Sequence, residues 1–241
     1  MLELKNISFE VEDEKEILKN INLKIDTGKF IVITGPNGGG KSTLARVIAG
    51  IQKPTEGQIF FEGQDITHAD ITQRAQMGIS FAFQQPVRFK GLTVFDLIST
   101  AAGRDLNQTE ACKYLSEVGL CARDYINREL NASLSGGEIK RIEIASVLAR
   151  GTKLSIFDEP EAGIDLWSFK NLIDVFKKMY AAINGTIIII SHQERILKIA
   201  DEIIVLADGN IISHGCRDEI LPRLLSGTDK VDFCPYQKLE D

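Results

Sequence analysis

The stretch Gly35-Pro36-Asn37-Gly38-Gly39-Gly40-Lys41-Ser42 decides the fold of this chain. It matches G-x-x-x-x-G-K-[ST], the pattern of a phosphate-binding loop. An apolar, β-branched run of strand type, 30–34, precedes it. After it, 44–49 has helical character and is stopped by Gly50. Because strand, glycine loop and helix follow one another as the pattern requires, the sequence predicts a phosphate site here.

The residue types of the loop fit this chemistry. Glycines let the backbone turn tightly, so that successive N–H groups and the positive end of the following helix face phosphate oxygens. The Lys41 ammonium is expected to reach the β- and γ-phosphates, and the Ser42 hydroxyl is expected to help hold Mg²⁺. The alternative, a glycine-rich surface turn that happens to precede a helix, is disfavoured by the predicted strand before the loop.

Composition bounds the class of protein. Of 241 residues, 44% are hydrophobic and 26% are charged, which are values of a globular chain. The formal net charge of −6 offers no general attraction to nucleic acid. The N-terminus lacks a secretory pattern, and the most apolar run, 186–191, is too short to cross a bilayer. We therefore expect a cytoplasmic protein with free cysteines, no nucleic-acid partner and no direct membrane insertion.

Hydrophobic patterning predicts an α/β fold. Strands and helices alternate on both sides of a helical block, 92–150, which indicates a mostly parallel sheet covered on both faces. The first 25 residues are predicted to form a mainly antiparallel β region. The fold class is thus a P-loop NTPase core with an N-terminal antiparallel β region and an inserted helical subdomain. The predicted divisions are a domain at 1–220, with a RecA-like core at 1–84 and 150–220 and the helical subdomain at 85–149, and a C-terminal tail at 221–241.

Two further segments carry chemistry. The apolar strand that begins at Leu154 ends in Asp158 and Glu159, and ligands of parallel sheets bind at the carboxyl ends of strands. Asp158 is placed to hold Mg²⁺, and Glu159 to polarise an attacking water. The turn Ser135-Gly136-Gly137 begins a long predicted helix and offers a hydroxyl and bare backbone amides, which predicts a second anion site, although a simple helix cap is the alternative.

In order and spacing these segments, together with Gln84, Asp165 and His192, resemble the nucleotide-binding domain of the ATP-binding cassette (ABC) superfamily. The resemblance covers the chain to about residue 220. It implies an ATP-dependent head-to-tail dimer in which the phosphate loop of one copy and Ser135–Gly137 of the other enclose each ATP. Gln84 would sense Mg²⁺ and the attacking water, Asp165 would couple the two sites, and His192 would contact the γ-phosphate.

The predicted site residues follow from these roles. The cofactors are ATP and Mg²⁺. Catalytic roles fall to Glu159, His192, Gln84 and Lys41, and Mg²⁺ contacts to Ser42, Gln84 and Asp158. The predicted nucleotide contacts are Val11, Gly35, Pro36, Asn37, Gly38, Gly39, Gly40, Lys41, Ser42, Thr43, Ser135, Gly136, Gly137 and Asp165.

The sequence departs from the usual pattern of the family at three positions. Val11 stands where the family usually stacks adenine on an aromatic ring, so the adenine contact is expected to be apolar. Glu138 stands where glutamine is commoner, and Ser155 interrupts the apolar run before Asp158.

Most members of the family drive membrane transporters, but four segments are similar to the cytosolic ATPase of the Suf iron–sulfur assembly system. They are Ala82–Val87, Ser135–Ile144, Glu161–Asp165 and Gln193–Leu197. This resemblance implies the motor of a soluble assembly complex, with a SufB- or SufD-like scaffold docked near 85–96. Pro160 and Glu161 are more typical of transporters. The alternative is therefore the ATP-binding subunit of an ABC membrane transporter, with transmembrane permease subunits as partners.

Two other classes are less consistent with the sequence. Chromosome-maintenance ATPases of related pattern separate the phosphate loop from the Ser-Gly-Gly turn by very long coiled coils, whereas only roughly 50 residues separate Gln84 from Ser135 here. A regulatory nucleotide-binding module without hydrolysis is disfavoured because Glu159 fills the position of the base.

Overall fold

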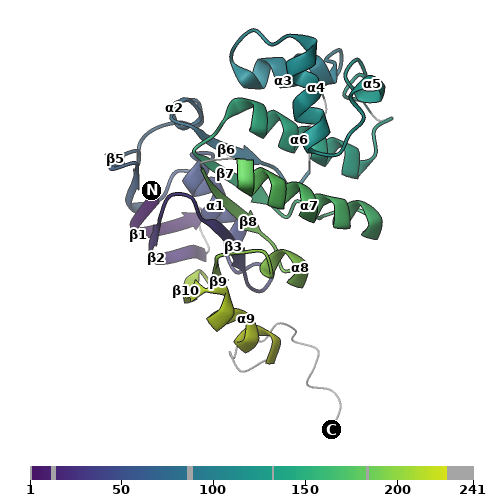
Figure 1. The fold of residues 1–241 in the computed structure, drawn as a ribbon. Coiled ribbons are helices and arrows are strands. Elements are labelled where there is room, and N and C mark those ends of the chain that lie inside the picture. Colours follow the sequence, from purple (N-terminus) through teal and green to yellow (C-terminus); the bar gives the residue numbers. More distant parts are fainter. Residues whose placement is uncertain (1, 12–14, 86–88, 132, 183–184, 227–241) are drawn as a thin grey trace. The chain divides into compact units, whose positions relative to one another are not determined.

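The computed structural model describes residues 2–11, 15–85, 89–131, 133–182 and 185–226 (Figure 1). The chain divides into two compact units. Unit 1 comprises 1–77 and 186–241, and unit 2 comprises 78–185. Each unit is described by itself below.

Unit 1 contains the N-terminal strands, the phosphate loop and the last part of the chain. Its strands are β1 (Leu2–Val11), β2 (Lys15–Ile25), β3 (Phe30–Thr34), β4 (Glu56–Phe61), β5 (Gln64–Asp65), β8 (Thr186–Ile190), β9 (Glu202–Ala207) and β10 (Asn210–Cys216). Its helices are α1 (Lys41–Ala49), α2 (Ile71–Gln76), α8 (Glu194–Leu197) and α9 (Arg217–Ser226).

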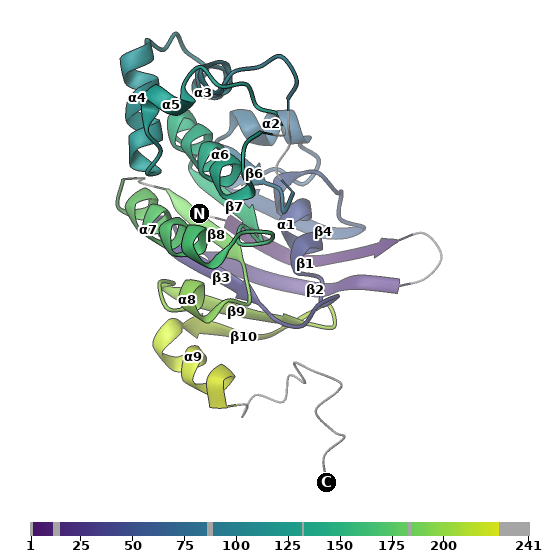
Figure 2. The same cartoon turned by 90° about the vertical axis from the view of Figure 1, so that its right-hand side faces the viewer.

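The N-terminal sheet of unit 1 is antiparallel, in the order β2-β1-β4-β5. Figure 2 shows the long strands β1 and β2 side by side. Leu4 lies opposite Leu23 on β2 and Ile59 on β4, and all three side chains are buried. Alternating apolar residues on neighbouring strands therefore fix the register of this sheet, since a slip by one residue would turn its apolar face to solvent.

The second strand set of unit 1 is mostly parallel, in the order β10-β9-β3-β8. β3 runs parallel to both β8 and β9, and all residues of β3 and β8 are buried. Continuous apolar runs are typical of parallel strands covered on both faces. The turn from β9 to β10 places Asp208 and Gly209 at φ 50° and 77°, the conformation that tight hairpins favour.

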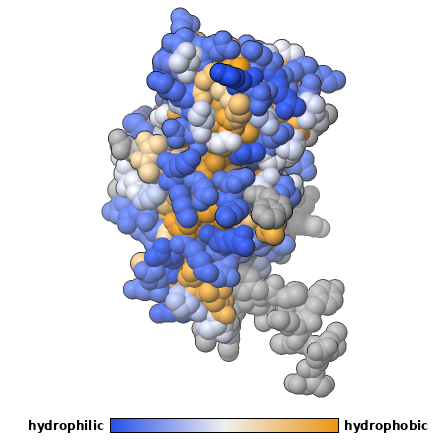
Figure 3. Space-filling model, turned by 45° about the vertical axis from the view of Figure 1, so that its right-hand side comes forward, coloured by the Kyte–Doolittle hydropathy of each residue, from blue (hydrophilic) through white to orange (hydrophobic). Residues whose placement is uncertain are grey.

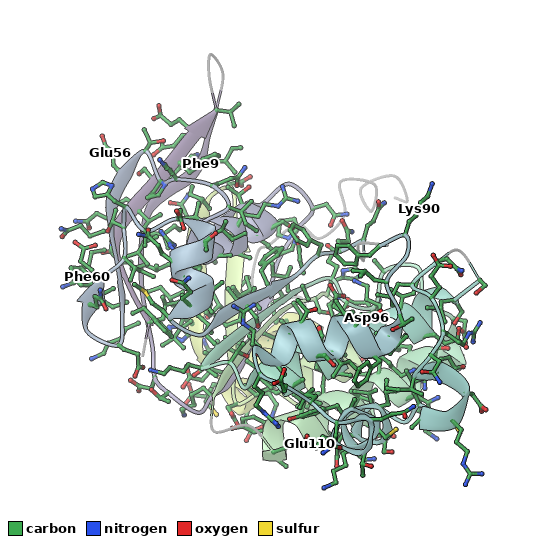
Figure 4. The ribbon with its side chains drawn as sticks, turned by 90° about the horizontal axis from the view of Figure 1, so that it is seen from above. Phe9, Glu56, Phe60, Lys90, Asp96 and Glu110 are labelled. Atoms are coloured by element: carbon green, nitrogen blue, oxygen red, sulfur yellow. The ribbon has the colours of Figure 1, made fainter. Side chains whose placement is uncertain are left out.

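Unit 2 contains two strands and the helical block. The strands are β6 (Ile79–Ala82) and β7 (Leu154–Asp158), which pair in parallel, and the helices are α3 (Val94–Ala102), α4 (Gln108–Glu117), α5 (Ala122–Tyr125), α6 (Gly136–Arg150) and α7 (Leu166–Ala182). Asp96 on α3 and Glu110 on α4 (Figure 4) close capping boxes with Thr93 and Asn107. These reciprocal bonds satisfy backbone N–H groups where each helix begins.

The surface and the core separate by polarity. In the view of Figure 3 most of the surface is hydrophilic, and apolar residues are exposed in small clusters. In the core of unit 2, Phe157 of β7 and Phe176 of α7 meet edge to face with ring centroids 5.0 Å apart. In the part of the chain that the structure describes, no helix is both long enough and apolar enough to span a bilayer.

The predicted α/β fold class is confirmed, with an antiparallel N-terminal sheet and a mostly parallel strand set. Helix α8 is short and spans only Glu194–Leu197. The N–H groups of Ile199 and Ala200 bond the third carbonyl back, so the α-helical pattern ends there. Unit 2 extends beyond the predicted helical subdomain, and α9 crosses residue 220; the predicted domain boundaries stay a prediction.

Candidate functional site

The phosphate loop of unit 1 follows β3 and ends at α1. Gly35 has φ 140°, and a Cβ atom on it would lie 2.0 Å from the Leu206 carbonyl oxygen on β9. No other residue fits there without moving the backbone. Gly40 caps α1 at φ 98° and has no side chain to occupy the first N–H groups of the helix. The loop therefore has the backbone geometry of an anion site at a helix N-terminus.

The Lys41 side chain is hydrogen-bonded to the backbone of the phosphate loop. Its Nζ atom lies 2.9 Å from the Gly35 carbonyl oxygen and 2.8 Å from that of Pro36, and the residue is 6% exposed. These two hydrogen bonds place the Lys41 ammonium against the phosphate loop. Ser42 and Thr43, half-buried, follow it in the first turn of α1.

His192 lies at the same edge of the parallel strands as the phosphate loop. β8 runs beside β3, and the Ser191 N–H donates to the Ile33 carbonyl 3.1 Å away. His192 follows Ser191 in the chain, and its imidazole is exposed. The Nε2 atom of this imidazole is 3.3 Å from the Gln193 side-chain nitrogen. The carboxyl ends of two parallel strands therefore bring His192 and the loop together within unit 1.

The remaining predicted nucleotide contacts in unit 1 are accessible to different degrees. Val11, at the end of β1, is 50% exposed, so its side chain can meet a ligand. Asn37 and Gly38 at the tip of the loop are exposed, Pro36 is half-buried, and Gly39 is buried.

In unit 2 the predicted hydrolytic residues come together at the ends of β6 and β7. Ala82 and Phe157 are register partners of this parallel pair, so Gln84 and Glu159 each lie two residues beyond it. The Gln84 side-chain nitrogen donates to a Glu159 carboxylate oxygen at 2.6 Å. Glu159 has φ 43°, which is uncommon for a residue with a side chain, and Asp158 beside it is 2% exposed.

The Ser135 turn is a capped helix start with a tyrosine at its side. The Ser135 hydroxyl accepts from the Glu138 N–H, and the Glu138 carboxylate accepts from the Ser135 N–H and from the Tyr125 hydroxyl, 2.5 Å away. Burial raises the pKa of Glu138, but the bonds from Tyr125 and Ser135 outweigh it and the net shift is downward. The same bond raises the pKa of Tyr125. Glu138 is therefore a fixed anion beneath the turn.

The glycines of this turn allow close packing against the segment before α7. A Cβ atom on Gly137 would lie 2.9 Å from the Ser168 Cβ, and one on Gly136 would lie 3.2 Å from the Gly163 carbonyl oxygen. The Asp165 carboxylate accepts from the Ser168 N–H at 3.0 Å. Unit 2 therefore brings Ser135–Gly137 and the Asp165 segment together, as the predicted dimer contact requires.

Three residues with evident structural roles were missed by the sequence interpretation. Lys140 and Glu143 on α6 both contact the backbone of Phe83, the residue before Gln84. Arg74 on α2, which is 1% exposed, donates to carbonyl groups at the end of α1. The i, i+3 spacing of Lys140 and Glu143 on a predicted helix was a signal for the first two. Arg74 gave no signal, because its partners are backbone atoms.

The donor set fits the magnesium ion that the family resemblance implies. Mg²⁺ prefers hard oxygen ligands and is held by one or two carboxylates together with substrate phosphates. Ser42, Gln84 and Asp158 offer a hydroxyl, an amide and a carboxylate oxygen. Among the residues that the structure describes, no cluster of three acidic, histidine or cysteine residues could hold a metal alone.

Comparison with known proteins agrees with this geometry. The phosphate loop between β3 and α1 and the acids at the end of β7 define a P-loop nucleotide-hydrolysing protein. A family model described as ABC transporter matches residues 18–162, more than half of the chain. The chain belongs to this family, and it is an ATPase of the cassette type.

The relatives include proteins of similar and of greater length. The chain is 38% identical to an uncharacterized ABC transporter ATP-binding protein of Methanocaldococcus jannaschii, over 86% of this chain and 85% of that protein. It is 35% identical to a spermidine/putrescine import ATP-binding protein of Mesoplasma florum, over 91% of this chain but 63% of that protein. A solved dimeric ATP-binding cassette bound to ADP and phosphate matches with a TM-score of 0.80 and 27% identity, over 90% of this chain and 99% of that one.

Proposed function

We propose that this chain is the ATP-hydrolysing subunit of an ABC membrane transporter. The observation that carries the ATPase part is the Gln84–Glu159 hydrogen bond at the carboxyl ends of β6 and β7, in a chain that also holds Lys41 within a phosphate loop. Transport is favoured over other cassette roles by the relatives, whose printed names describe transporter ATP-binding proteins.

ATP binding is assigned to the loop of unit 1. The backbone N–H groups after Gly35 and at the start of α1 would bind phosphate oxygens, and the Lys41 ammonium would reach the β- and γ-phosphates. The side chains of Ser42, Gln84 and Asp158 would hold Mg²⁺, which neutralises charge on the β- and γ-phosphates when bound. Val11 would contact adenine through its exposed apolar side chain.

Hydrolysis is assigned to Glu159 as the general base. Its carboxylate would accept a proton from the water that attacks the γ-phosphorus, and the bond to leaving ADP would then break. Gln84 would orient that carboxylate and the water through the hydrogen bond already present. His192 would donate to a γ-phosphate oxygen and stabilise the charge that develops there.

A head-to-tail dimer would complete each site. Ser135–Gly137 of the second copy would close over the γ-phosphate, with Asp165 at the contact between copies. Leu166, next to Asp165 at the start of α7, is 67% exposed, which is unusual for so large an apolar side chain and suits an interface. The related cassette whose solved structure is a dimer with ADP and phosphate supports this arrangement.

The motor of an iron–sulfur assembly complex is the second candidate. Its support is the resemblance of four segments, Ala82–Val87, Ser135–Ile144, Glu161–Asp165 and Gln193–Leu197, to the Suf ATPase. In that role the partner would be a SufB- or SufD-like scaffold. Either partner could use the exposed apolar side chains Phe83, Phe89 and Leu92 of unit 2, near the outward-pointing Lys90 (Figure 4).

Hydrolysis is tested with the purified full chain and ATP. We expect Mg²⁺-dependent phosphate release, and a loss of about 100-fold or more in kcat for Glu159→Gln with ATP binding retained. Glu117→Gln changes an exposed glutamate of α4 and serves as the matched control. Parental kcat in Glu159→Gln would overturn the role of Glu159, and no hydrolysis by the parent would overturn the proposed function.

The partner is tested by co-purification from the cells that express the chain. A transporter subunit should be recovered with the membrane fraction, bound to a polytopic permease, and should return to the soluble fraction when Phe83 and Leu92 are changed to serine. Recovery only with a soluble, iron-containing scaffold would overturn transport and establish the assembly role with the same ATP site.

A further inference from the structure

Both polar groups of the Phe83 backbone are held by helix α6. The Lys140 Nζ atom donates to the Phe83 carbonyl oxygen at 2.6 Å, and the Phe83 N–H donates to the Glu143 carboxylate. Phe83 is the first residue after β6, and Gln84 follows it directly. The side chains of Lys140 and Glu143, both on α6, therefore hold the backbone of the residue that precedes Gln84.

The two side chains lie together, with Lys140 buried and Glu143 half-buried. Lys140 is 3% exposed and Glu143 20% exposed, and their charged atoms lie 3.8 Å apart across one helical turn. Such an ion pair is weak evidence for stability, because apolar residues of similar volume often stabilise a core equally well or better. A purely structural role for the pair is the alternative interpretation, and it predicts no specific change in kcat when the pair is replaced.

Phe83 is connected to Glu159 through its neighbour Gln84, and α6 is connected directly to the Ser135 turn where it begins. Gln84 donates to Glu159 at 2.6 Å, so a shift of Phe83 would move this amide away from the carboxylate. At its other end, α6 begins at the Ser135 turn, which is proposed to contact the ATP of the second copy. All of these contacts lie within unit 2.

We propose that Lys140 and Glu143 are positioning residues that hold the Phe83 backbone so that the Gln84 amide meets Glu159. They thereby couple α6 and its Ser135 turn to the group that orients the attacking water. This inference rests on the proposed ATPase function. It assigns a role in the kcat step to two residues that act through the Phe83 backbone and Gln84.

The main test replaces both charges at once. Lys140→Met with Glu143→Leu removes both contacts with the Phe83 backbone without leaving one charge of the pair alone. The unfolding free energy of this variant, measured beside kcat, is expected to fall because the Phe83 N–H and carbonyl groups lose these partners. Its kcat should fall about tenfold, whereas its KM for ATP should stay within about twofold, because the phosphate loop is unchanged. Lys198→Met changes the residue directly after α8, in an exposed pair with Glu194, and is the matched control that should keep parental kcat.

A double-mutant cycle with Gln84→Ala tests whether the pair acts through Gln84. In the Gln84→Ala background, the Lys140→Met and Glu143→Leu changes should cost less than about twofold in kcat, because the group that they position is gone. The single variant Lys140→Arg keeps a donor for the Phe83 carbonyl and should therefore retain at least half of the parental kcat. Independent, multiplicative losses or parental kcat in the charge-free variant would overturn the positioning role while leaving the ATPase intact. Absence of hydrolysis by the parent would instead overturn the proposed function.

Discussion

The Gln84 side-chain amide donates to the Glu159 carboxylate at 2.6 Å, across two parallel strands that are 75 residues apart in sequence. The bond fixes the orientation of a carboxylate whose backbone already has an unusual φ of 43°. A residue held this way by a neutral amide keeps its negative charge available to accept a proton. The relationship therefore suits a general base better than a structural ion pair would.

Removal of the Gln84 amide should slow hydrolysis without preventing ATP binding. We expect Gln84→Ala to lower kcat about tenfold or more, because the Glu159 carboxylate and the water lose their orienting group. The measurement is steady-state phosphate release with a parallel ATP titration. Gln85→Ala, the exposed neighbour, is the control. Equal losses in both variants would point to damage of the segment rather than to Gln84.

Lys41 should control nucleotide affinity. Lys41→Met removes the ammonium that lies on the carbonyls of Gly35 and Pro36, so the affinity for ATP should fall at least about tenfold. Titration with a fluorescent ATP analogue measures this loss, and Lys24→Met on the exposed face of β2 is the control. Parental affinity in Lys41→Met would mean that the triphosphate binds elsewhere.

Much of the fold could be predicted because local patterns agree with it. Helix α3 lies inside the predicted helical block, 92–150, and Thr93 and Asp96 of its capping box can be recognised in the sequence. The continuous apolar runs of β3 and β8 likewise predicted buried parallel strands. The position of the candidate site could also be predicted, because ligands of parallel sheets bind at the carboxyl ends of the strands.

Features set by tertiary contacts could not be predicted. The hydrogen bond from the Lys140 ammonium to the Phe83 carbonyl joins residues that are 57 positions apart, and no local pattern specifies that partner. Helix α2 was also missed, although Asp70 and Gln73 form its capping box, because its single turn and a half lacks a clear apolar stripe. Val11 could be placed at the end of β1, but what its exposed side chain binds stays a prediction.

Arg74 should be a large contributor to stability. Its guanidinium is buried and donates to five carbonyl groups, and burial lowers its pKa to about 10, so it stays charged at neutral pH. The acceptors are the carbonyl oxygens of Val47, Ile48, Ile66, Thr67 and Ala69. Arg74→Leu leaves these acceptors unpaired beneath α1.

We expect Arg74→Leu to lower the free energy of unfolding by about 3 kcal/mol or more, since each unpaired buried acceptor costs about 1–3 kcal/mol. Urea unfolding followed by circular dichroism measures this loss. Arg123→Leu changes an exposed arginine of α5 and should stay within about 0.5 kcal/mol of the parent. A change no larger than that of the control would show that water replaces the guanidinium.

Glu143 should make stability depend on pH in a defined window. Burial raises the pKa of Glu143 from 4.5 to about 7, although Lys140 and the Phe83 N–H oppose the shift. The unfolded chain therefore releases this proton near pH 4.5, whereas the folded protein keeps it until about pH 7. The contribution of this group to stability is complete below pH 4.5 and is lost as the pH rises to about 7.

Glu143→Gln isolates this contribution, because glutamine still accepts the Phe83 N–H but does not titrate. Carboxylates with lowered pKa values, such as Glu138 and Asp96, add the opposite slope at lower pH, but they are common to both proteins and cancel in the difference. The unfolding free energy of Glu143→Gln minus that of the parent should therefore increase from pH 4.5 to about 7 and then level off. A flat difference across this window would show that Glu143 is ionised throughout, beside a charged Lys140.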